Sequence, residues 1–319
     1  MVKALALQDE MTQALGACVF DVTLDCEDGA PVGGEKDHAL MVAALAARAV
    51  KATSSEPNAR ARRVAVRVHP VDHPAFEQDV NIVLGEAAAA WCHLMIPKVD
   101  SVSDIDRAVR VIDAALKRSN RVEVLPLHVL VESPLAVHQV AQIAAHPRVE
   151  SLSFGLMDFV SAHGGAIPAS AMTVAEPGAS ASHDQFSHPL VLRAKLEISA
   201  ACHAMGKVPS HCVVTEFRRP EVVLAAARRV SRELGFTRMW SIHPDQIQPI
   251  LAAFTPEPSE VEQASLIICE AQAAGWAPIS VAGTLHDRAS YRYYWQVLEK
   301  AFQTARLQRH DPAYPYFTA

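Results

Sequence analysis

The alternation of short apolar runs with long amphipathic segments constrains the fold of this 319-residue chain more than any other feature. Runs such as VLPLHVLV, which ends at Val131, are apolar on both faces, as strands of a parallel sheet are when helices cover them. The alternation therefore predicts βα units around a parallel sheet. We expect strands over Ala17–Cys26, Arg63–Val68, Trp91–Pro97, Val122–Val131, Ser151–Gly155, Lys207–Val214 and Arg238–Ile242.

The segments between these runs have helical periodicity and helical start signals. Ser101 lies three residues before Asp104, and Ser133-Pro134 opens another helix. We expect helices over Lys3–Ala14, Glu35–Lys51, Pro74–Ala90, Val102–Arg118, Leu135–Ala145, Pro189–His203 and Pro220–Leu234. This pattern predicts an α/β TIM (β/α)₈ barrel. Because it contains seven strands and the chain opens inside a helix, we expect the first strand to precede Met1.

Two segments do not follow the repeat. Ile167–His188 is rich in Ala, Ser, Pro and His and is predicted to be a long loop after the carboxyl end of a strand. The tail from Pro256 contains two further helical patterns, Ser259–Ala274 and His286–Gln308. We therefore expect a barrel domain over residues 1–255 and a C-terminal helical extension over residues 256–319.

Composition and charge exclude several classes of protein. A net charge of −6 and a pI near 6.2 argue against nucleic acid as the main partner. No run approaches about 18 consecutive apolar residues, so no membrane span is expected. The N-terminal MVKALALQDEMTQ has acidic residues where a signal peptide needs an apolar core, which favours a cytoplasmic protein. The six cysteines lack CxxC spacing and indicate reduced thiols rather than disulfides or a zinc site.

Polar side chains follow most of the expected strands. Because active sites of barrels lie at the carboxyl ends of the strands, these side chains are candidates for one site. In chain order they are Asp25, Glu27, Asp28, Arg67, His69, Lys98, Glu132, Asp158 and His243.

Glu132 and Asp158 end adjacent strands with no Cys or His cluster beside them, which favours a cation that prefers oxygen ligands, such as Mg²⁺. The planar guanidinium of Arg67 suits a carboxylate or a developing enolate oxygen. A metal ion and an arginine together can stabilise an enolate, as retro-aldol or retro-Claisen cleavage requires. Each residue also has a plainer interpretation. A lone Glu at a strand end is more often a helix-cap or salt-bridge partner, Glu27 and Asp28 beside Gly29 can form a turn, and Arg67 and Lys98 can be structural.

The ordered series of motifs resembles the family of the citrate lyase beta subunit, malyl-CoA lyase and citramalyl-CoA lyase. The resemblance covers nearly the whole chain. Its motifs are LDCEDGAP at Asp25–Asp28, EK at Glu35-Lys36, RV-H-P at Arg67, IPKVD at Lys98, VES at Glu132, GLMDF at Asp158, GF-R-WSIHPDQI from Gly235 to Ile247 and G-TLHD at Gly283–Asp287.

The resemblance implies a role for each matching residue. It implies a barrel with a C-terminal helical extension, in which Glu132 and Asp158 bind Mg²⁺ (or Mn²⁺) and Arg67 holds the acyl or keto-acid oxygen. Glu27 and Asp28 then support the metal waters and substrate, and Lys36, Lys98 and His69 contact substrate or CoA. Asp287 reaches a neighbouring subunit's site and transfers a proton, which implies a homotrimer or hexamer. The family's LFVPG-like first strand agrees with a strand missing before Met1.

Four features depart from the family pattern. His69 stands where Asn is usual, and Cys26 stands where Leu is usual. The loop between Gly164 and His188 does not follow the citrate or malyl-CoA enzymes, and PSHCVVTEF replaces an acidic end of the sixth strand. These differences leave the substrate open.

We therefore expect a Mg²⁺-dependent lyase that cleaves, or forms, a 3-hydroxy-carboxyacyl-CoA, with a 2-keto acid and acetyl- or propionyl-CoA as products. Two alternatives are an aldolase that acts without CoA and a citrate lyase beta-type subunit that needs a thioester carrier protein. Affinity for CoA separates these alternatives, because binding CoA requires basic residues near a groove. The basic candidates are Lys36, Arg60, Arg62 and Arg63.

Overall fold

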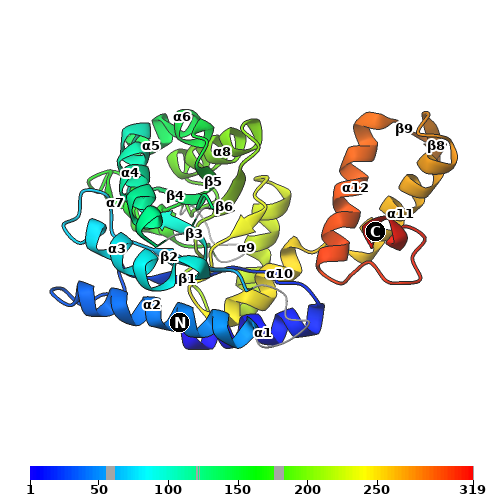
Figure 1. Ribbon diagram of the computed structural model, residues 1–319. Helices are drawn as coiled ribbons and strands as arrows, with labels where there is room; N and C mark the ends of the chain where they lie inside the picture. Colours follow the sequence, from blue (N-terminus) through cyan, green and yellow to red (C-terminus); the bar gives the residue numbers. More distant parts are fainter. Residues whose placement is uncertain (55–61, 120, 122, 176–182, 319) are drawn as a thin grey trace.

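In the computed structural model, seven parallel strands form one sheet in sequence order from β1 to β7 (Figure 1). The structure describes residues 1–54, 62–119, 121, 123–175 and 183–318. Each of the seven predicted strands is present, although β1, β4, β6 and β7 are half as long as predicted or shorter. The strands are β1 (Val22–Asp25), β2 (Val64–Arg67), β3 (Trp91–Ile96), β4 (Leu127–Val131), β5 (Val149–Phe154), β6 (Val208–His211) and β7 (Arg238–Met239).

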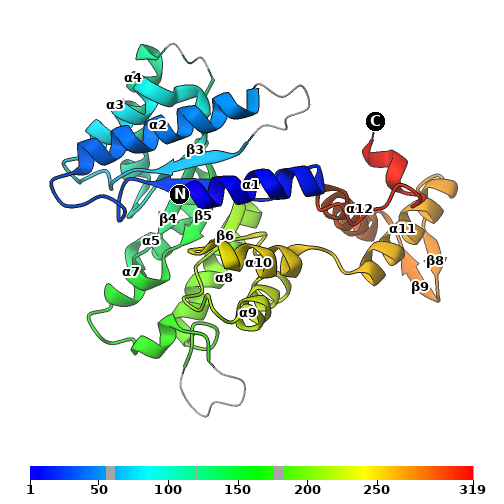
Figure 2. The ribbon, with the colours of Figure 1, turned by 90° about the horizontal axis from the view of Figure 1, so that it is seen from below.

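Helices connect the strands and cover the outer side of the curled sheet (Figures 1 and 2). Because every connected pair of strands is parallel, all seven carboxyl ends lie at one end of the sheet. The helices are α1 (Val2–Leu15), α2 (Glu35–Ser54), α3 (Phe76–Ala87), α4 (Val102–Arg118), α5 (Pro134–His138), α6 (Val140–Ala145), α7 (Leu156–Ser161), α8 (Pro189–Ala204), α9 (Pro220–Arg232), α10 (Ile247–Phe254), α11 (Pro258–Ala273) and α12 (Arg288–Gln303). No helix among the described residues is long and apolar enough to cross a membrane.

Local sequence signals explain most helix boundaries. Ser101 and Asp104 form a capping box at the start of α4, whose last turn holds Lys117 and Arg118. The predicted helix Leu135–Ala145 is instead divided into α5 and α6, because Gln139 leaves the helical region at φ −96° and ψ 2°. The sequence gives no breaker at this position, so the division was not predicted.

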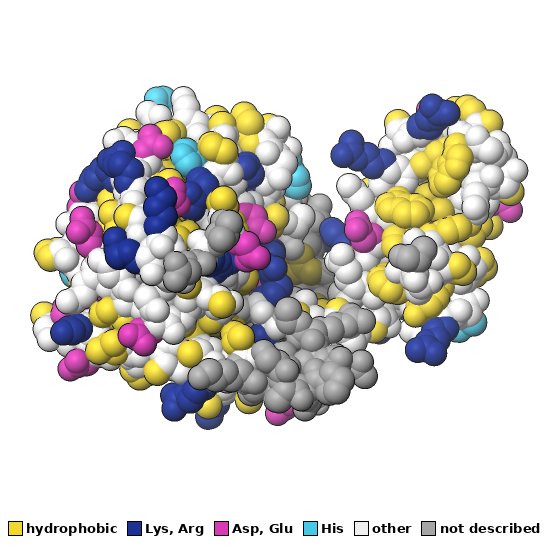
Figure 3. All heavy atoms as spheres, in the orientation of Figure 1, with side chains coloured by type: hydrophobic (Ala, Val, Ile, Leu, Met, Phe, Trp, Pro, Cys, Tyr) yellow, Lys and Arg dark blue, Asp and Glu magenta, His cyan; other side chains and the backbone are white. Residues whose placement is uncertain are grey.

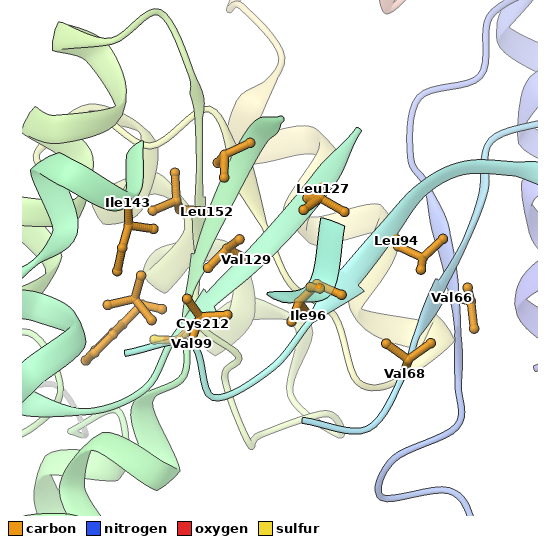
Figure 4. Close-up of a cluster of buried hydrophobic side chains, with 14 of the residues drawn as sticks. Val66, Val68, Leu94, Ile96, Val99, Leu127, Val129, Ile143, Leu152 and Cys212 are labelled. Carbon is orange, nitrogen blue, oxygen red and sulfur yellow. The ribbon is translucent and has the colours of Figure 1, made fainter. Parts of the chain in front are cut away.

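The main hydrophobic core lies between the sheet and its helices. Figure 4 shows Val66, Leu94, Val129 and Leu152 on neighbouring strands, with Ile143 reaching them from α6. These five side chains are fully buried. The alternate strand positions are mixed: His128 lies 2.6 Å from Ser151 Oγ and 2.8 Å from Ser153 Oγ, whereas Met95 and Leu130 are apolar.

The sheet is not closed among the described residues, because neither β1 nor β7 has a second ladder partner there. The ends of these two strands are nevertheless connected by an ion pair, in which Arg238 Nη1 lies 3.3 Å from Asp21 Oδ2. A closed eight-stranded barrel therefore stays a prediction.

Residues after Phe254 form a lobe that projects from the sheet and its helices (Figures 1 and 2). Ion pairs of Arg228 with Glu257 and of Arg232 with Glu260 join the start of this lobe to α9. This C-terminal lobe has its own hydrophobic cluster, to which α11 and α12 both contribute. It also contains an unpredicted hairpin of β8 (Ile279–Val281) and β9 (Thr284–His286). Its two-residue turn, Ala282-Gly283, has positive φ at both positions (51° and 79°). Since alanine rarely adopts this conformation, the sequence signal for the turn was weak, and the predicted helix from His286 begins only at Arg288.

Apolar side chains are also exposed on the C-terminal lobe, as its yellow surface in Figure 3 shows. Leu285 is 71% exposed, Tyr293 is 56% exposed and Leu266 is 50% exposed. A small lobe with this much exposed apolar surface has the character of an interaction surface.

Candidate active site

Arg67 is the centre of a cluster of carboxylates at the carboxyl end of the sheet. As the last residue of β2, it forms a bidentate pair with Asp25, the last residue of β1, with Nε–Oδ1 and Nη2–Oδ2 distances of 2.7 and 2.6 Å. Its Nη1 lies 2.8 Å from Glu27 Oε2, and its Nη2 lies 2.9 Å from Asp28 Oδ2. From the sequence we expected Glu27 and Asp28 to support the metal waters and substrate, and Asp25 was a candidate without a role.

The partners of Arg67 differ in how firmly they are held. The side chain of Asp28 is 76% exposed, whereas that of Glu27 is 8% exposed. Burial alone would lower the pKa of Arg67, but the hydrogen bonds and charges of the three carboxylates outweigh it and raise this pKa. Because an exposed ion pair contributes little free energy, Asp28 is the partner that an anionic ligand could replace most easily.

Glu132 follows β4 and is almost completely buried, with 7% of its surface exposed. Its Oε2 accepts a hydrogen bond of 3.1 Å from the backbone N–H of Lys98, which follows β3. The Lys98 side chain points to the same cluster, where its Nζ lies 3.0 Å from Glu27 Oε1. Burial, followed by the negative charges of Asp158 and Glu27, raises the pKa of Glu132 to about 7. The site therefore lacks enough positive charge to compensate Glu132 fully.

Gly155 explains how Glu132 fits at this position. A Cβ atom at Gly155 would lie 2.3 Å from Glu132 Cγ and 2.5 Å from its Oε1. Both distances are shorter than any tolerable contact, so a side chain here would displace the Glu132 carboxylate. The backbone of Gly155 has negative φ, which shows that space rather than backbone freedom requires glycine. Sequence reasoning missed this residue because its role depends on a neighbouring strand.

Asp158 lies in the first turn of α7, directly after β5, and is exposed. Its charge acts on both Glu132 and Lys98, which places it in the same cluster. The donors that Glu132, Asp158 and Glu27 offer are carboxylate oxygens, as Mg²⁺ prefers. A divalent cation bound by these carboxylates would supply the positive charge whose lack raises the pKa of Glu132.

Three of the residues to which the resemblance gives a role lie outside this cluster within one chain, and His243 stacks on Phe217 instead, with ring centroids 4.9 Å apart. His69 is buried against α3, where its Nδ1 lies 2.6 Å from Asp79 Oδ2 and its ring stacks on His73 at 4.3 Å. Lys36 is exposed in the first turn of α2. Asp287 is on the C-terminal lobe, where its Oδ1 caps α12 by accepting a hydrogen bond of 2.9 Å from the Ala289 N–H.

Two of the basic residues considered for CoA lie at the opposite end of the sheet. Arg62 is paired with Asp9 on α1, and Arg63 Nε lies 2.6 Å from Asp21 Oδ1, before the amino end of β1. Arg60 lies outside the described residues. The carboxylate of Asp21 also approaches Cys92 and His93, but two guanidinium groups already engage it. The carboxyl end is therefore the stronger candidate for a catalytic site.

The comparisons with known proteins cover the part of the chain that carries this cluster. A family model described as HpcH/HpaI aldolase/citrate lyase matches residues 4–244, which include the whole carboxylate cluster. The chain belongs to this family. Membership confirms the resemblance seen in the sequence and the expectation of an enzyme of the carbon–carbon lyase class.

Members of the HpcH/HpaI family with similar sequences or folds include lyases. An L-malyl-CoA/beta-methylmalyl-CoA lyase from Rhodobacter capsulatus is 30% identical over 252 residues, covering 75% of this chain and 76% of the relative. The crystal structure of a citrate lyase from Burkholderia xenovorans LB400 is 49% identical with a TM-score of 0.81, covering 100% of this chain and 92% of that one. Protein CitE from Mycobacterium tuberculosis, in complex with magnesium, acetoacetate and coenzyme A, is 19% identical with a TM-score of 0.63, covering 93% and 95%, and shares the fold.

The raised pKa of Glu132 predicts a specific dependence of stability on pH in protein freed of divalent cations. Folding raises this pKa from 4.5 to about 7, so the native state retains the proton over a range where the unfolded chain has lost it. The free energy of unfolding should therefore fall as pH rises from 4.5 to 7, by on the order of 3 kcal/mol. Urea unfolding in EDTA at several pH values measures this dependence.

Glu132→Gln should remove most of this dependence, so that the variant is more stable than the wild type at pH 8 and similar to it near pH 4. Glu86→Gln, at an exposed position of α3, serves as the matched control and should follow the wild type. A Glu132→Gln variant that keeps the wild-type pH dependence would contradict the assignment.

Proposed function

We propose that this chain is a Mg²⁺-dependent carbon–carbon lyase that cleaves, or forms, a 3-hydroxy-carboxyacyl-CoA. The products of cleavage are a 2-keto acid and acetyl- or propionyl-CoA. The observation that carries the proposal is the buried Glu132 carboxylate, which lies beside Asp158 and the Arg67 cluster in space provided by Gly155. Membership of the HpcH/HpaI family, with its malyl-CoA and citrate lyases, supports the same chemistry.

Glu132 and Asp158 would hold the Mg²⁺ ion, with Glu27 close enough to support it. When bound, the ion would polarise oxygen atoms of the substrate and offset negative charge. Lys98 fixes one Glu132 oxygen through its backbone N–H and holds Glu27 through its side chain. These contacts set the carboxylates in place before the substrate binds, so little reorganisation is needed during the reaction.

Arg67 would bind the reacting acyl group. In cleavage, a carboxylate of the cluster would accept the proton of the substrate hydroxyl, the Cα–Cβ bond breaks, and its electron pair passes to the thioester as an enolate. The enolate oxygen carries the new negative charge, which the guanidinium of Arg67 can accept once a ligand replaces the exposed Asp28. The enolate then takes a proton at its α-carbon to give the acyl-CoA product.

We further propose that Asp287 supplies or accepts this proton in the site of a neighbouring subunit of a homotrimer or hexamer. Within one chain it belongs to the lobe that stands apart from the carboxylate cluster (Figure 1). The exposed apolar side chains of the C-terminal lobe support its packing against another subunit. A closed eight-stranded barrel is part of the same proposal, supported by the free edges of β1 and β7 and the Asp21–Arg238 ion pair between them.

The Arg67→Ala variant tests the proposed chemistry. We expect kcat for thioester cleavage to fall by about 10²–10³, as for removal of another group that stabilises an oxyanion. The assay measures release of a 2-keto acid from malyl-, citramalyl- and citryl-CoA with Mg²⁺ present. Arg110→Ala, at an exposed position of α4, is the control. Full activity of Arg67→Ala would contradict the mechanism, and release of the CoA thiol without a keto acid would indicate thioester hydrolysis instead.

The Gly155→Ala variant tests the metal site without turnover. Because the new Cβ would displace the Glu132 carboxylate, we expect affinity for Mg²⁺ to fall by on the order of tenfold or more. Isothermal titration with Mg²⁺ measures this change. Gly85→Ala is a matched control, since a Cβ at that position of α3 meets nothing within 4 Å. Equal Mg²⁺ affinity in both variants would argue against Glu132 as a ligand.

Mixed oligomers test the role of Asp287. Arg67→Ala and Asp287→Asn should each be nearly inactive alone, because each damages every site. When the two are co-expressed in equal amounts, about a quarter of the sites combine an intact barrel with an intact lobe from the neighbour. We therefore expect about a quarter of the wild-type activity. Assembled mixed oligomers that stay inactive would show that Asp287 does not complete a neighbouring site.

A further inference from the structure

Three side chains at the amino end of the sheet bring a sulfur, a nitrogen and an oxygen atom close together. Asp21 directly precedes β1, and Cys92 and His93 belong to β3, which lies on the other side of β2. Their ligand atoms all lie within 4.8 Å of one another. Cys92 Sγ is 3.4 Å from His93 Nδ1, which in turn lies 3.9 Å from Asp21 Oδ2. None of the three residues has a part in the proposed lyase reaction.

An irregularity in β3 explains how two consecutive residues can reach the same point. Successive side chains of a regular strand point to opposite faces of the sheet. Here β2 advances by two residues, from Val64 to Val66, while β3 advances by three, from Trp91 to Leu94. The extra residue is therefore one of the pair Cys92-His93. Bulges of this kind change the direction of a side chain and are frequent beside functional sites.

The spacing of the three atoms fits a tetrahedral cation with mixed ligands. Zn²⁺ binds thiolate sulfur at about 2.3 Å and imidazole nitrogen or carboxylate oxygen at about 2.0–2.2 Å. In a tetrahedron these bond lengths separate sulfur from nitrogen by about 3.5 Å and nitrogen from oxygen by about 3.3 Å. The first separation is already present, and the second requires a small shift of Asp21. Mg²⁺ prefers oxygen ligands alone, so this site and the carboxylate cluster select different metals.

The protonation of the nitrogen and sulfur atoms also suits a metal site. Burial lowers the pKa of His93 to about 4, so its ring is neutral near pH 7. Its Nδ1 faces the Cys92 sulfur and can accept a hydrogen bond from the S–H group. A metal ion would replace that proton and bind both atoms. Because burial raises the pKa of the Cys92 thiol to about 12, the thiolate would form only together with the metal–sulfur bond.

The two guanidinium groups next to Asp21 leave one of its oxygens available. Arg63 Nε makes a short contact of 2.6 Å with Oδ1. Oδ2, which faces the imidazole of His93, makes longer contacts of 3.3 Å with Arg63 Nη2 and Arg238 Nη1. A carboxylate has about four lone pairs, so it can bind a metal ion and an arginine together. The negative charge of Glu150 also acts on Arg63 and offsets part of the repulsion between the guanidinium groups and a cation.

We propose that Asp21, Cys92 and His93 bind Zn²⁺ at a second metal site, with water in the fourth position. The ion connects the start of β1 to β3 across β2. Because the three ligands meet only in the folded chain, the ion stabilises the amino end of the sheet. The cysteines lack CxxC spacing, so the sequence predicted no zinc site. The bulge and the order of the strands, rather than spacing along the chain, bring these ligands together.

Cobalt spectroscopy tests the site, because Co²⁺ can replace Zn²⁺ and its bond to a thiolate absorbs in the near ultraviolet. We would titrate metal-free, full-length protein with Co²⁺ in the presence of excess Mg²⁺. We expect one thiolate–cobalt band per chain, which Zn²⁺ abolishes. Cys92→Ser should lose this band and bind Zn²⁺ about a hundredfold more weakly, since loss of even an outer-shell partner costs about 10–100-fold in affinity.

Two variants serve as controls. Cys269→Ser removes a partly exposed thiol of the C-terminal lobe and should keep the band. Glu132→Gln, at the proposed Mg²⁺ site, should also keep it, because that site offers no sulfur. Circular dichroism confirms that Cys92→Ser is folded. Absence of the band from the wild type, its persistence in Cys92→Ser or its loss in Cys269→Ser would overturn the proposal.

Thiol labelling gives a second readout on the unaltered chain. Cys18, Cys92 and Cys269 are each partly exposed and can react with iodoacetamide. Mass spectrometry of the labelled peptides measures each thiol separately. We expect Zn²⁺ to protect Cys92 and to leave the labelling of Cys18 and Cys269 unchanged. Equal labelling of Cys92 with and without Zn²⁺ would contradict binding at its sulfur. Failure of the lyase assay would not affect this proposal, because no step of that reaction uses the zinc ion.

Discussion

The crowding of carboxylates around Arg67 and Lys98 is the interaction on which the rest of the site depends. Asp25, Glu27, Asp28, Glu132 and Asp158 bring five carboxyl groups to the carboxyl end of the sheet, against two positive charges. Such an arrangement is unfavourable without a rigid support, because like charges in a buried site repel one another strongly. The buried strands and helices provide this support. The fold therefore keeps an excess of negative charge at one place, where a cation can neutralise it.

Sequence reasoning predicted that the candidate site residues converge because the carboxyl ends of parallel strands meet. Arg67, Lys98 and Glu132 each follow an apolar run, and their positions in the chain were enough to predict that they converge. The ordered motifs then distinguished the family from other barrels. The strands and most helices were also predictable, since burial on both faces and capping residues such as Ser101 act locally.

Other features depend on contacts between distant segments and could not be predicted. Gly155 is required by a side chain on the neighbouring strand, and Asp25 holds Arg67 across 42 positions of the sequence. His69 follows Arg67 closely, but its ring is buried against Asp79 on α3 instead of joining the cluster. The hairpin at Ala282-Gly283 was missed because Ala282 has positive φ, a conformation that alanine rarely adopts and that the sequence therefore does not indicate.

The ion pair between Asp21 and Arg238 has a consequence for folding. Its two residues are 217 positions apart in the chain, although they lie in contact at the ends of β1 and β7. Closing such a long loop costs considerable chain entropy unless the strands between them are already in place. The contact should therefore form late, after β2 to β6 have assembled. A spectroscopic probe placed at the Asp21–Arg238 contact would report the completion of the sheet rather than its nucleation.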